Sequence, residues 1–175
     1  TKSEKSTIIM PGFINLWKGH DILLNALLEV REKIPNIKLI IAGKVHDAEF
    51  FESLNRNILY SDLIDNVEFH TDYLDEKQMS ILLSRATLAV LPYRRINFSA
   101  ALLDCIDWEI PTIVSNIPQF RELCPKLPKF GQTIESAGTL YECDGDHEDC
   151  WCVKPSHLLA EKIIELLKDR KKLTQ

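Results

Sequence analysis

Short apolar runs rich in β-branched residues alternate along this chain with segments of helical periodicity. The runs are STIIMPGF, IKLIIAGK, NVEFHTD, TLAVLPY and PTIVSNI, which begin at residues 6, 37, 66, 87 and 111. Between the first two runs, apolar residues recur at helical spacing at Leu23, Leu27, Val30 and Ile34. Continuous apolar runs indicate strands buried on both faces, and strands alternating with helices indicate β-α-β units. We therefore predict an α/β fold built on a doubly wound parallel sheet with helices on both faces.

Local signals place the helices between these strands. Asp47 is positioned to cap a helix, and Asp75 with Gln78 forms a capping pair for a helix that runs to Arg85. We expect further helices at Ala100 to Trp108, near residues 119–123, and in the closing segment, whose apolar stripe is Leu159, Ile163 and Leu166.

The regular alternation stops at an acidic, cysteine-rich stretch at about residues 124–154, which we interpret as an irregular insertion with one strand at Thr139–Glu142. Within it four side chains could ligate zinc, namely Cys143, His147, Cys150 and Cys152. Their spacing matches no zinc module, and Cys-x-Cys is tight for one tetrahedral ion. The alternative is an acidic insertion with reduced thiols, and we expect no metal.

Composition limits the classes of function. The net charge is -5 and the sequence contains no basic block, which argues against nucleic acid as a partner. No apolar run approaches the roughly 20 residues that a membrane-spanning helix needs. The five cysteines are odd in number, which fits a reducing, cytoplasmic setting better than a disulfide framework. A length of 175 residues corresponds to one domain.

The loops that follow the strands meet at one edge of such a sheet, where ligands bind beside the switch in strand order. In the first loop, Lys18 and Gly19 fall where a helix begins, so free N–H groups, the helix dipole and an ammonium could together hold phosphate. The alternative is a solvated lysine. In the fourth loop, Ser99 or Asn97 can cap the next helix, and its amides can face an anion or merely begin the helix.

Several other polar residues are less informative. We expect Arg94 and Arg95 at the surface rather than in contact with a ligand. Asp104 is either a solvated carboxylate or an acceptor for sugar hydroxyls. We interpret His20 and His157, at helix starts, as surface or capping residues.

The ordered set of motifs resembles the nucleotide-sugar-binding, C-terminal half of a GT-B glycosyltransferase, of the retaining group 1, family-four type. The motifs are GFINLWKGHDILLNAL, IKLIIAGK, NVEFHTDYLDEKQMSILLSRATLAVLPY and LLDCIDWEIPTIVSNIPQFREL. The resemblance covers roughly Thr7 to Leu123 and resumes at about Pro155. It implies a Rossmann-like domain.

The resemblance also implies roles for single residues. Lys18 matches a lysine that contacts the donor diphosphate, Ser99 and Ala100 match a pair whose amides approach phosphate and ribose, and Asp104 matches an acid that holds ribose hydroxyls. The backbone at His70 and Thr71 matches a loop that reads the base. The full set of implied donor-binding positions is Gly12, Asn15, Lys18, Gly43, Lys44, His70, Thr71, Ser99, Ala100 and Asp104. No catalytic residue is implied.

The sequence departs from the family pattern at four places. Ile96 stands where the pattern has the first acid of its Glu-x7-Glu motif, Asn15 where it has a second basic residue, and Glu109 where it has a glycine. Phe69-His70-Thr71 stands where the pattern has Phe-x-Gly, so the glycine is replaced by Thr71. A non-catalytic domain with a degenerate donor site, kept for interaction or scaffolding, is therefore the alternative. An unrelated flavodoxin or response-regulator type of domain lacks support, because the acidic phosphoacceptor geometry is missing.

The resemblance implies the donor-binding half of an enzyme that transfers a sugar from a UDP- or GDP-sugar to a glycan or glycolipid acceptor, as in polysaccharide biosynthesis. The acceptor-binding domain of such enzymes has no room in 175 residues. We therefore expect residues 1–175 to form one domain of a longer two-domain chain, inactive alone and cytoplasmic. The alternative location for that longer chain is the inner face of the membrane, by peripheral attachment.

Overall fold

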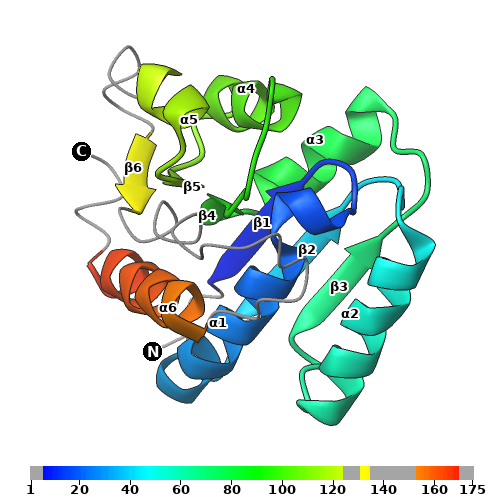
Figure 1. Ribbon diagram of the computed structural model, residues 1–175, viewed down its shortest axis with the longest axis vertical. Coiled ribbons are helices and arrows are strands. Elements are labelled where there is room, and N and C mark those ends of the chain that lie inside the picture. Colours follow the sequence, from blue (N-terminus) through cyan, green and yellow to red (C-terminus); the bar gives the residue numbers. More distant parts are fainter. Residues whose placement is uncertain (1–5, 124–130, 135–152, 170–175) are drawn as a thin grey trace, which may run out of the picture.

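The computed structural model describes residues 6–123, 131–134 and 153–169. Its strands are β1 (Thr7–Pro11), β2 (Lys38–Ala42), β3 (Val67–His70), β4 (Leu88–Leu91), β5 (Thr112–Ser115) and β6 (Gly131–Ile134). Its helices are the 3-10 turn η1 (Leu16–Lys18), α1 (His20–Lys33), α2 (Ala48–Tyr60), α3 (Glu76–Ser84), α4 (Ala100–Asp107), α5 (Pro118–Leu123) and α6 (Val153–Lys168). Figure 1 shows how these elements surround the sheet.

The described strands form one six-stranded parallel sheet in the order β3-β2-β1-β4-β5-β6. The chain moves outward from β1 to β3, returns to β4 beside β1, and then moves outward in the other direction. This order is that of doubly wound dinucleotide-binding folds, and its switch point lies between β1 and β4. The prediction of a Rossmann-like parallel sheet is confirmed.

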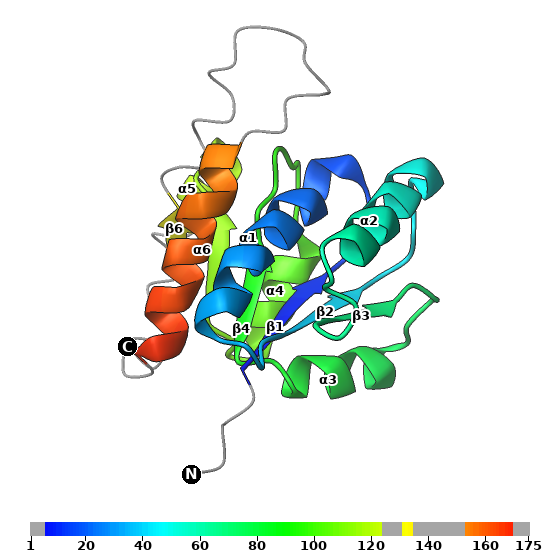
Figure 2. The same cartoon turned by 90° about the horizontal axis from the view of Figure 1, so that it is seen from below.

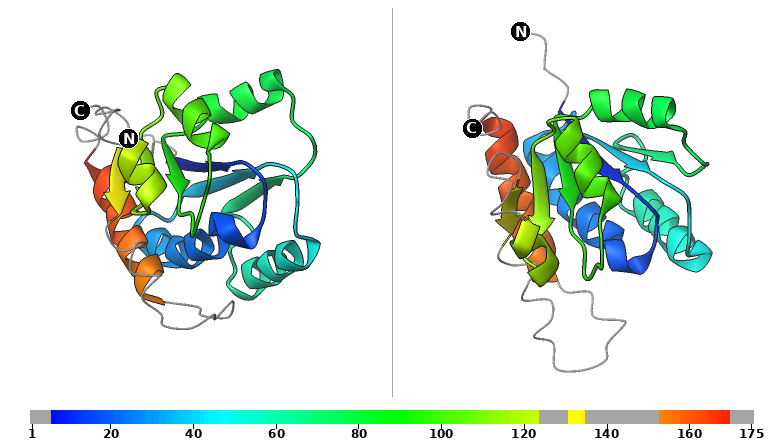
Figure 3. Two further views of the ribbon diagram at one scale, coloured as in Figure 1. Left: turned by 45° about the horizontal axis from the view of Figure 1, so that its top comes forward. Right: turned by 90° about the horizontal axis from the view of Figure 1, so that it is seen from above.

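Alternate side chains of the central strands fill two separate cores. Ile8 and Met10 lie in the larger cluster, with buried residues of α1, α2 and α6, whereas Ile9 lies in the smaller cluster with residues of α3 and α4. All three side chains are fully buried. The sheet therefore has α1, α2 and α6 on one face and α3 and α4 on the other (Figure 2), and α1 lies between α2 and α6 (Figure 3).

The predicted caps are present. An Asp47 side-chain oxygen accepts a hydrogen bond from the Phe50 amide at 2.9 Å. Asp75 and Gln78 bond each other's backbone amides reciprocally, which completes a capping box at the start of α3. These caps satisfy amides that the first turn of a helix leaves without intrahelical partners.

The chain after α5 departs from the prediction. Strand β6 pairs with β5 at Gly131–Ile134, inside a stretch that we expected to be loop. The strand expected at Thr139–Glu142 and the candidate zinc ligands Cys143, His147, Cys150 and Cys152 lie outside the described residues. Within the described part of the chain, no helix is both long and apolar enough to cross a membrane.

Candidate functional site

Residues 93–95, which follow β4, contact the segment from η1 to the start of α1. The Arg94 guanidinium donates two hydrogen bonds to the Asp21 carboxylate, at 2.8 and 2.6 Å, and one to the Leu16 carbonyl at 2.8 Å. The Arg94 amide also donates to the Trp17 carbonyl at 2.8 Å. An ion pair between half-buried Arg94 and buried Asp21 therefore holds the loop after β4 against the start of α1.

The neighbours of Arg94 make two further contacts across the same boundary. The Lys18 ammonium lies over the Tyr93 ring, 3.9 Å from its centroid. The Arg95 guanidinium stacks on Trp17, with its central carbon 3.3 Å from the ring centroid. Cations over aromatic faces at such distances are attracted by the ring quadrupole. Tyr93, Arg94 and Arg95 thus each bind a residue of the opposite loop.

Lys18, Tyr93 and Gly12 enclose a small gap at the end of β1. A methyl group placed on Gly12 would lie 3.9 Å from Lys18 Nζ, 3.8 Å from Tyr93 Oη and 3.6 Å from the Ala101 side chain. Because Ala101 belongs to the first turn of α4, the gap also adjoins the N-terminus of that helix. An ammonium and the first turn of α4 thus meet beside Gly12 at the switch point, and a cation and helix amides are the groups that bind anions.

Lys18 carries an uncompensated charge. No carboxylate of the described residues lies within ion-pair distance of its ammonium. Burial lowers the pKa of Lys18 to about 8, so the side chain is still mostly charged at pH 7. A bound anion would raise that pKa again because it favours the ammonium form.

Two glycines let the edge loops approach one another closely. Gly43 has a φ of +157°, and a methyl group on it would lie 2.1 Å from the Gly12 carbonyl oxygen. Gly19, at φ +75°, would meet the Pro92 carbonyl oxygen at the same distance. No other residue type fits at either position without backbone movement.

The remaining predicted residues on this side have structural tasks that the contacts define. The Asn15 side chain caps η1 by accepting a hydrogen bond from the Lys18 amide at 3.2 Å. Ser99 is buried and caps α4 through the Leu102 amide at 3.1 Å, whereas Ala100 is exposed beside it. The Lys44 side chain is exposed, and its carbonyl accepts from the Ile14 amide at 2.9 Å.

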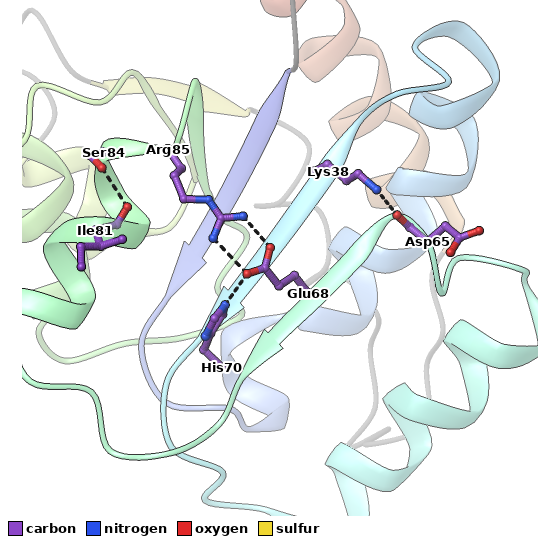
Figure 4. Close-up of polar contacts among 7 residues, drawn as sticks. All are labelled: Lys38, Asp65, Glu68, His70, Ile81, Ser84 and Arg85. Atoms are coloured by element: carbon purple, nitrogen blue, oxygen red, sulfur yellow. Dashed lines mark hydrogen bonds and ion pairs between the residues drawn. The ribbon is translucent and has the colours of Figure 1, made fainter.

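The predicted residues on the β3 side lie in a different environment. The His70 ring contacts Glu68 at 2.6 Å, and the Glu68 carboxylate also binds Arg85 (Figure 4). The His70 carbonyl accepts from the Gly43 amide at 2.8 Å, and Thr71 follows it half-buried. The backbone at His70 thus joins the Gly43 turn, while its side chain contacts Glu68 of the same strand.

Asp104 lies on the α4 surface that faces α3. It lines an open groove whose other walls include Tyr73, Met79 and Trp108. Burial and the neighbouring Asp107 raise its pKa. The described contacts do not bring Asp104 to the Lys18 ammonium.

Two expectations about basic residues were wrong. Arg94 is a half-buried ion-pair partner rather than a surface residue, because its guanidinium binds the Asp21 carboxylate and the Leu16 carbonyl. His20 is buried edge-on to Phe50, with ring centroids 6.3 Å apart, and burial lowers its pKa to about 4. It is therefore neutral at pH 7. The role of Tyr93 was missed, because an aromatic residue at a strand end gives no local signal of a cation.

The departures from the family pattern have visible structural consequences. Ile96 packs its half-buried side chain against the larger core cluster, as an apolar residue should. Glu109 adopts a φ of +53°, the left-handed conformation that glycine favours. The chain keeps the turn at the end of α4 without the glycine.

Comparison with known families decides the relationship. A model of the family described as glycosyl transferases group 1 matches residues 1–126. The chain belongs to the glycosyl transferases group 1 family. A comparison with curated proteins finds no match.

Solved structures of glycosyltransferases share the fold of this group 1 domain. The C-terminal domain of the Francisella tularensis group 1 protein LpcC superposes with a TM-score of 0.71 at 14% identity, covering 96% of this chain and 78% of that one. Anabaena HepE in complex with UDP-glucose gives a TM-score of 0.72 at 18% identity, covering 97% and 41%. The pneumococcal O-GlcNAc transferase GtfA, in complex with UDP and GlcNAc, gives 0.68 at 14% identity, covering 96% and 30%. The chain thus spans less than half of HepE or GtfA.

Proposed function

We propose that this domain binds the nucleoside-diphosphate sugar donor of a glycosyltransferase, with the diphosphate at the switch point between β1 and β4. The observation that carries the proposal is the Lys18 ammonium, which lies beside Gly12 and the start of α4 and has no carboxylate partner among the described residues. Membership of the group 1 family and the UDP-glucose bound in the HepE structure support it.

In this proposal the chain's own groups stabilise the leaving diphosphate. The Lys18 ammonium and the first amides of α4 face the phosphate oxygens, where negative charge accumulates as the bond to the sugar breaks. Asp104 and the backbone at Thr71 hold the ribose and the base. This chemistry needs no metal, so we propose donor binding without a divalent cation.

The whole activity requires a second domain in this proposal. A glycan or glycolipid acceptor binds to that domain in a longer chain, and transfer occurs when both substrates are positioned together. The present domain alone therefore binds the donor but transfers sugar poorly. We propose a cytoplasmic location for the longer protein, with peripheral attachment to the membrane where its acceptor is a lipid-linked sugar.

The first experiment measures thermal unfolding of the chain with millimolar UDP, GDP or ADP, with EDTA present. A ligand at 100 times its Kd adds about 2.7 kcal/mol to the free energy of unfolding. For a domain of this size, the midpoint should rise by roughly 5–10 °C with one nucleotide. Lys18→Met removes the charge at similar length and should abolish the rise, whereas Lys33→Met, at an exposed site in the last turn of α1, should retain it.

A non-catalytic role is the second candidate, and the packing of Ile96 favours it. An isoleucine packed against the core cannot replace the acid that the family pattern places there for the donor sugar. The same panel separates the candidates. No shift with any nucleotide would favour an interaction domain with a lost donor site, whereas a Lys18-dependent shift would exclude that loss.

A further inference from the structure

The half-buried Lys18 side chain has an aromatic partner rather than a carboxylate. Ammonium groups withdrawn from water are usually paired with carboxylates, but the described residues offer this one an aromatic ring instead, at 3.9 Å. A carboxylate would cancel the charge and compete with an incoming phosphate. A ring face attracts the cation through its quadrupole and leaves its net charge intact.

The ring that holds Lys18 is itself firmly held. Tyr93 is fully buried at the end of β4 and packs against Phe120, with ring centroids 5.5 Å apart. The next residue, Arg94, is anchored by Asp21, and the Tyr93 carbonyl accepts a hydrogen bond from the Ser115 hydroxyl at 2.6 Å. The platform is therefore fixed to the sheet, whereas a free lysine has several rotatable bonds.

The phenol hydroxyl of Tyr93 contributes little to this arrangement. It is buried, and it makes no hydrogen bond within the described residues. Burial raises the pKa of Tyr93, so the group stays neutral at pH 7. The aromatic face, rather than the hydroxyl, is the part that contacts Lys18.

We propose that Tyr93 is a positioning residue whose ring holds the Lys18 ammonium at the Gly12 gap, ready for the donor phosphate. At position 15, where the family pattern has a second basic residue, this chain has an asparagine that caps η1, so Lys18 has no basic neighbour there. The inference rests on the proposed donor binding and adds a residue on the opposite side of the switch point.

The test compares two replacements of Tyr93 by calorimetric titration with UDP. Tyr93→Phe keeps the ring and removes only the unpaired hydroxyl, so the Kd should stay within about twofold of the original. Tyr93→Met fills a similar volume without a ring. Because a flexible lysine then loses its freedom on binding, the Kd should rise by about threefold to tenfold. Thermal unfolding of each variant identifies conditions under which both are fully folded.

A double-mutant cycle shows whether Tyr93 acts through Lys18. In a Lys18→Met background, adding Tyr93→Met should change the UDP affinity by less than about twofold, because the group being positioned is gone. Equal losses in both backgrounds would overturn the proposal and assign Tyr93 a general structural role. A Tyr93→Phe loss as large as that of Tyr93→Met would assign the effect to the hydroxyl. Tighter binding by Tyr93→Met would show that the ring competes with the ligand for Lys18.

A measurement without nucleotide separates this inference from the proposed function. The ring should shift the NMR signals of the Lys18 ε-methylene protons upfield in the original chain and in Tyr93→Phe, and Lys18→Met assigns those signals. Absence of UDP binding with the upfield shift present would refute the donor site but retain the platform. Absence of the shift in the original chain would refute the platform itself.

Discussion

Two arginine–carboxylate pairs with the same chemistry lie in opposite settings. Arg94 and Asp21 meet at the switch point, where their side chains are only 18% and 5% exposed. Arg85 and Glu68 meet on edge strand β3, where the exposed fractions are 45% and 41%. Both arginines bind their partners with two hydrogen bonds, at 2.6 to 3.0 Å.

Because the bond geometry of the two pairs is similar, burial decides how much each pair contributes to the free energy of unfolding. Water screens the edge pair, and such pairs contribute about 0–1 kcal/mol. The inner pair is shielded, so removing one partner leaves a charge that nothing compensates, at a cost of about 3–5 kcal/mol. The inner pair also joins the loop after β4 to the start of α1 at the candidate site, whereas the outer pair joins the C-cap of α3 to β3.

The largest expected effect is the loss of the inner arginine. Arg94→Met should lower the free energy of unfolding by about 3–5 kcal/mol, because Asp21 stays buried and unpaired. The matched change on the edge strand, Arg85→Met, should lower it by less than about 1 kcal/mol. Urea denaturation of both variants measures the difference. Equal losses would contradict the role given to burial.

The next effect concerns Lys18, beside the inner pair. Its free pKa of about 8 predicts that UDP affinity is constant near pH 7 and falls above pH 8. Each further pH unit should weaken binding by about tenfold until the pKa of the bound state is reached. Titration calorimetry between pH 7 and about 10 tests this dependence. Lys18→Arg keeps its charge over that range, so its affinity should not change with pH.

The same pKa shift has a consequence for the chain without ligand. The folded pKa of Lys18 lies below the ordinary lysine value of 10.5, so the unfolded state binds more protons between pH 8 and 10.5. The free energy of unfolding should therefore rise with pH across that window. Lys18→Met should remove this contribution, and Arg85→Met on the edge strand should retain it. Denaturation at a series of pH values measures both.

A smaller effect is expected at the end of α4. Glu109 closes a Schellman motif, in which its amide bonds the Ile106 carbonyl at 2.9 Å and the Ile110 amide bonds the Cys105 carbonyl at 2.9 Å. Its left-handed φ costs about 1 kcal/mol relative to glycine, so Glu109→Gly should stabilise the chain by roughly that amount. In a Glu109→Gly background, the Arg94→Met variant would be more stable, so the losses of Arg94–Asp21 and Arg85–Glu68 could be compared more precisely.

The end of α2 provides the matched control for Glu109. Asp62 has a φ of +54° in the same kind of turn, but aspartate tolerates this conformation better than glutamate does. Asp62→Gly should therefore stabilise less than Glu109→Gly when both are measured by urea denaturation. A larger gain at Asp62 would contradict this account of backbone strain.

The smallest effect is the acid dependence of the edge pair. Hydrogen bonding to Arg85 lowers the pKa of Glu68 from 4.5 to about 2, although burial opposes the shift. Because the folded pKa is depressed, this stabilisation is present above about pH 4.5 and is lost as the pH falls towards 2. Glu68→Gln should lack that dependence and lose less than about 1 kcal/mol at pH 7. Acid titration of the unfolding free energy compares the two.

The site was only partly predictable from the sequence. Local patterns locate Lys18 and Ser99 at helix starts, the family resemblance adds Gly12 and Gly43, and the structure brings Lys18 and Gly43 close to Gly12. Their role in donor binding stays a prediction. Arg94 was misplaced because its partner, Asp21, is 73 residues away in the sequence. Nothing near Tyr93 indicates that Lys18 lies on its ring.

The sequence alone determined the alternation of strands and helices up to α5, their parallel arrangement and the caps at Asp47 and Asp75. These features depend on hydrophobic periodicity and on hydrogen bonds between residues three apart. Only the tertiary structure decided the pairing of β6 with β5, the burial of His20 and the contacts of residues 93–95 with η1 and α1. The physical reason is that these contacts join segments that are distant in the sequence. Strand order and burial, which no local pattern encodes, determine which residues meet and how strongly their charges interact.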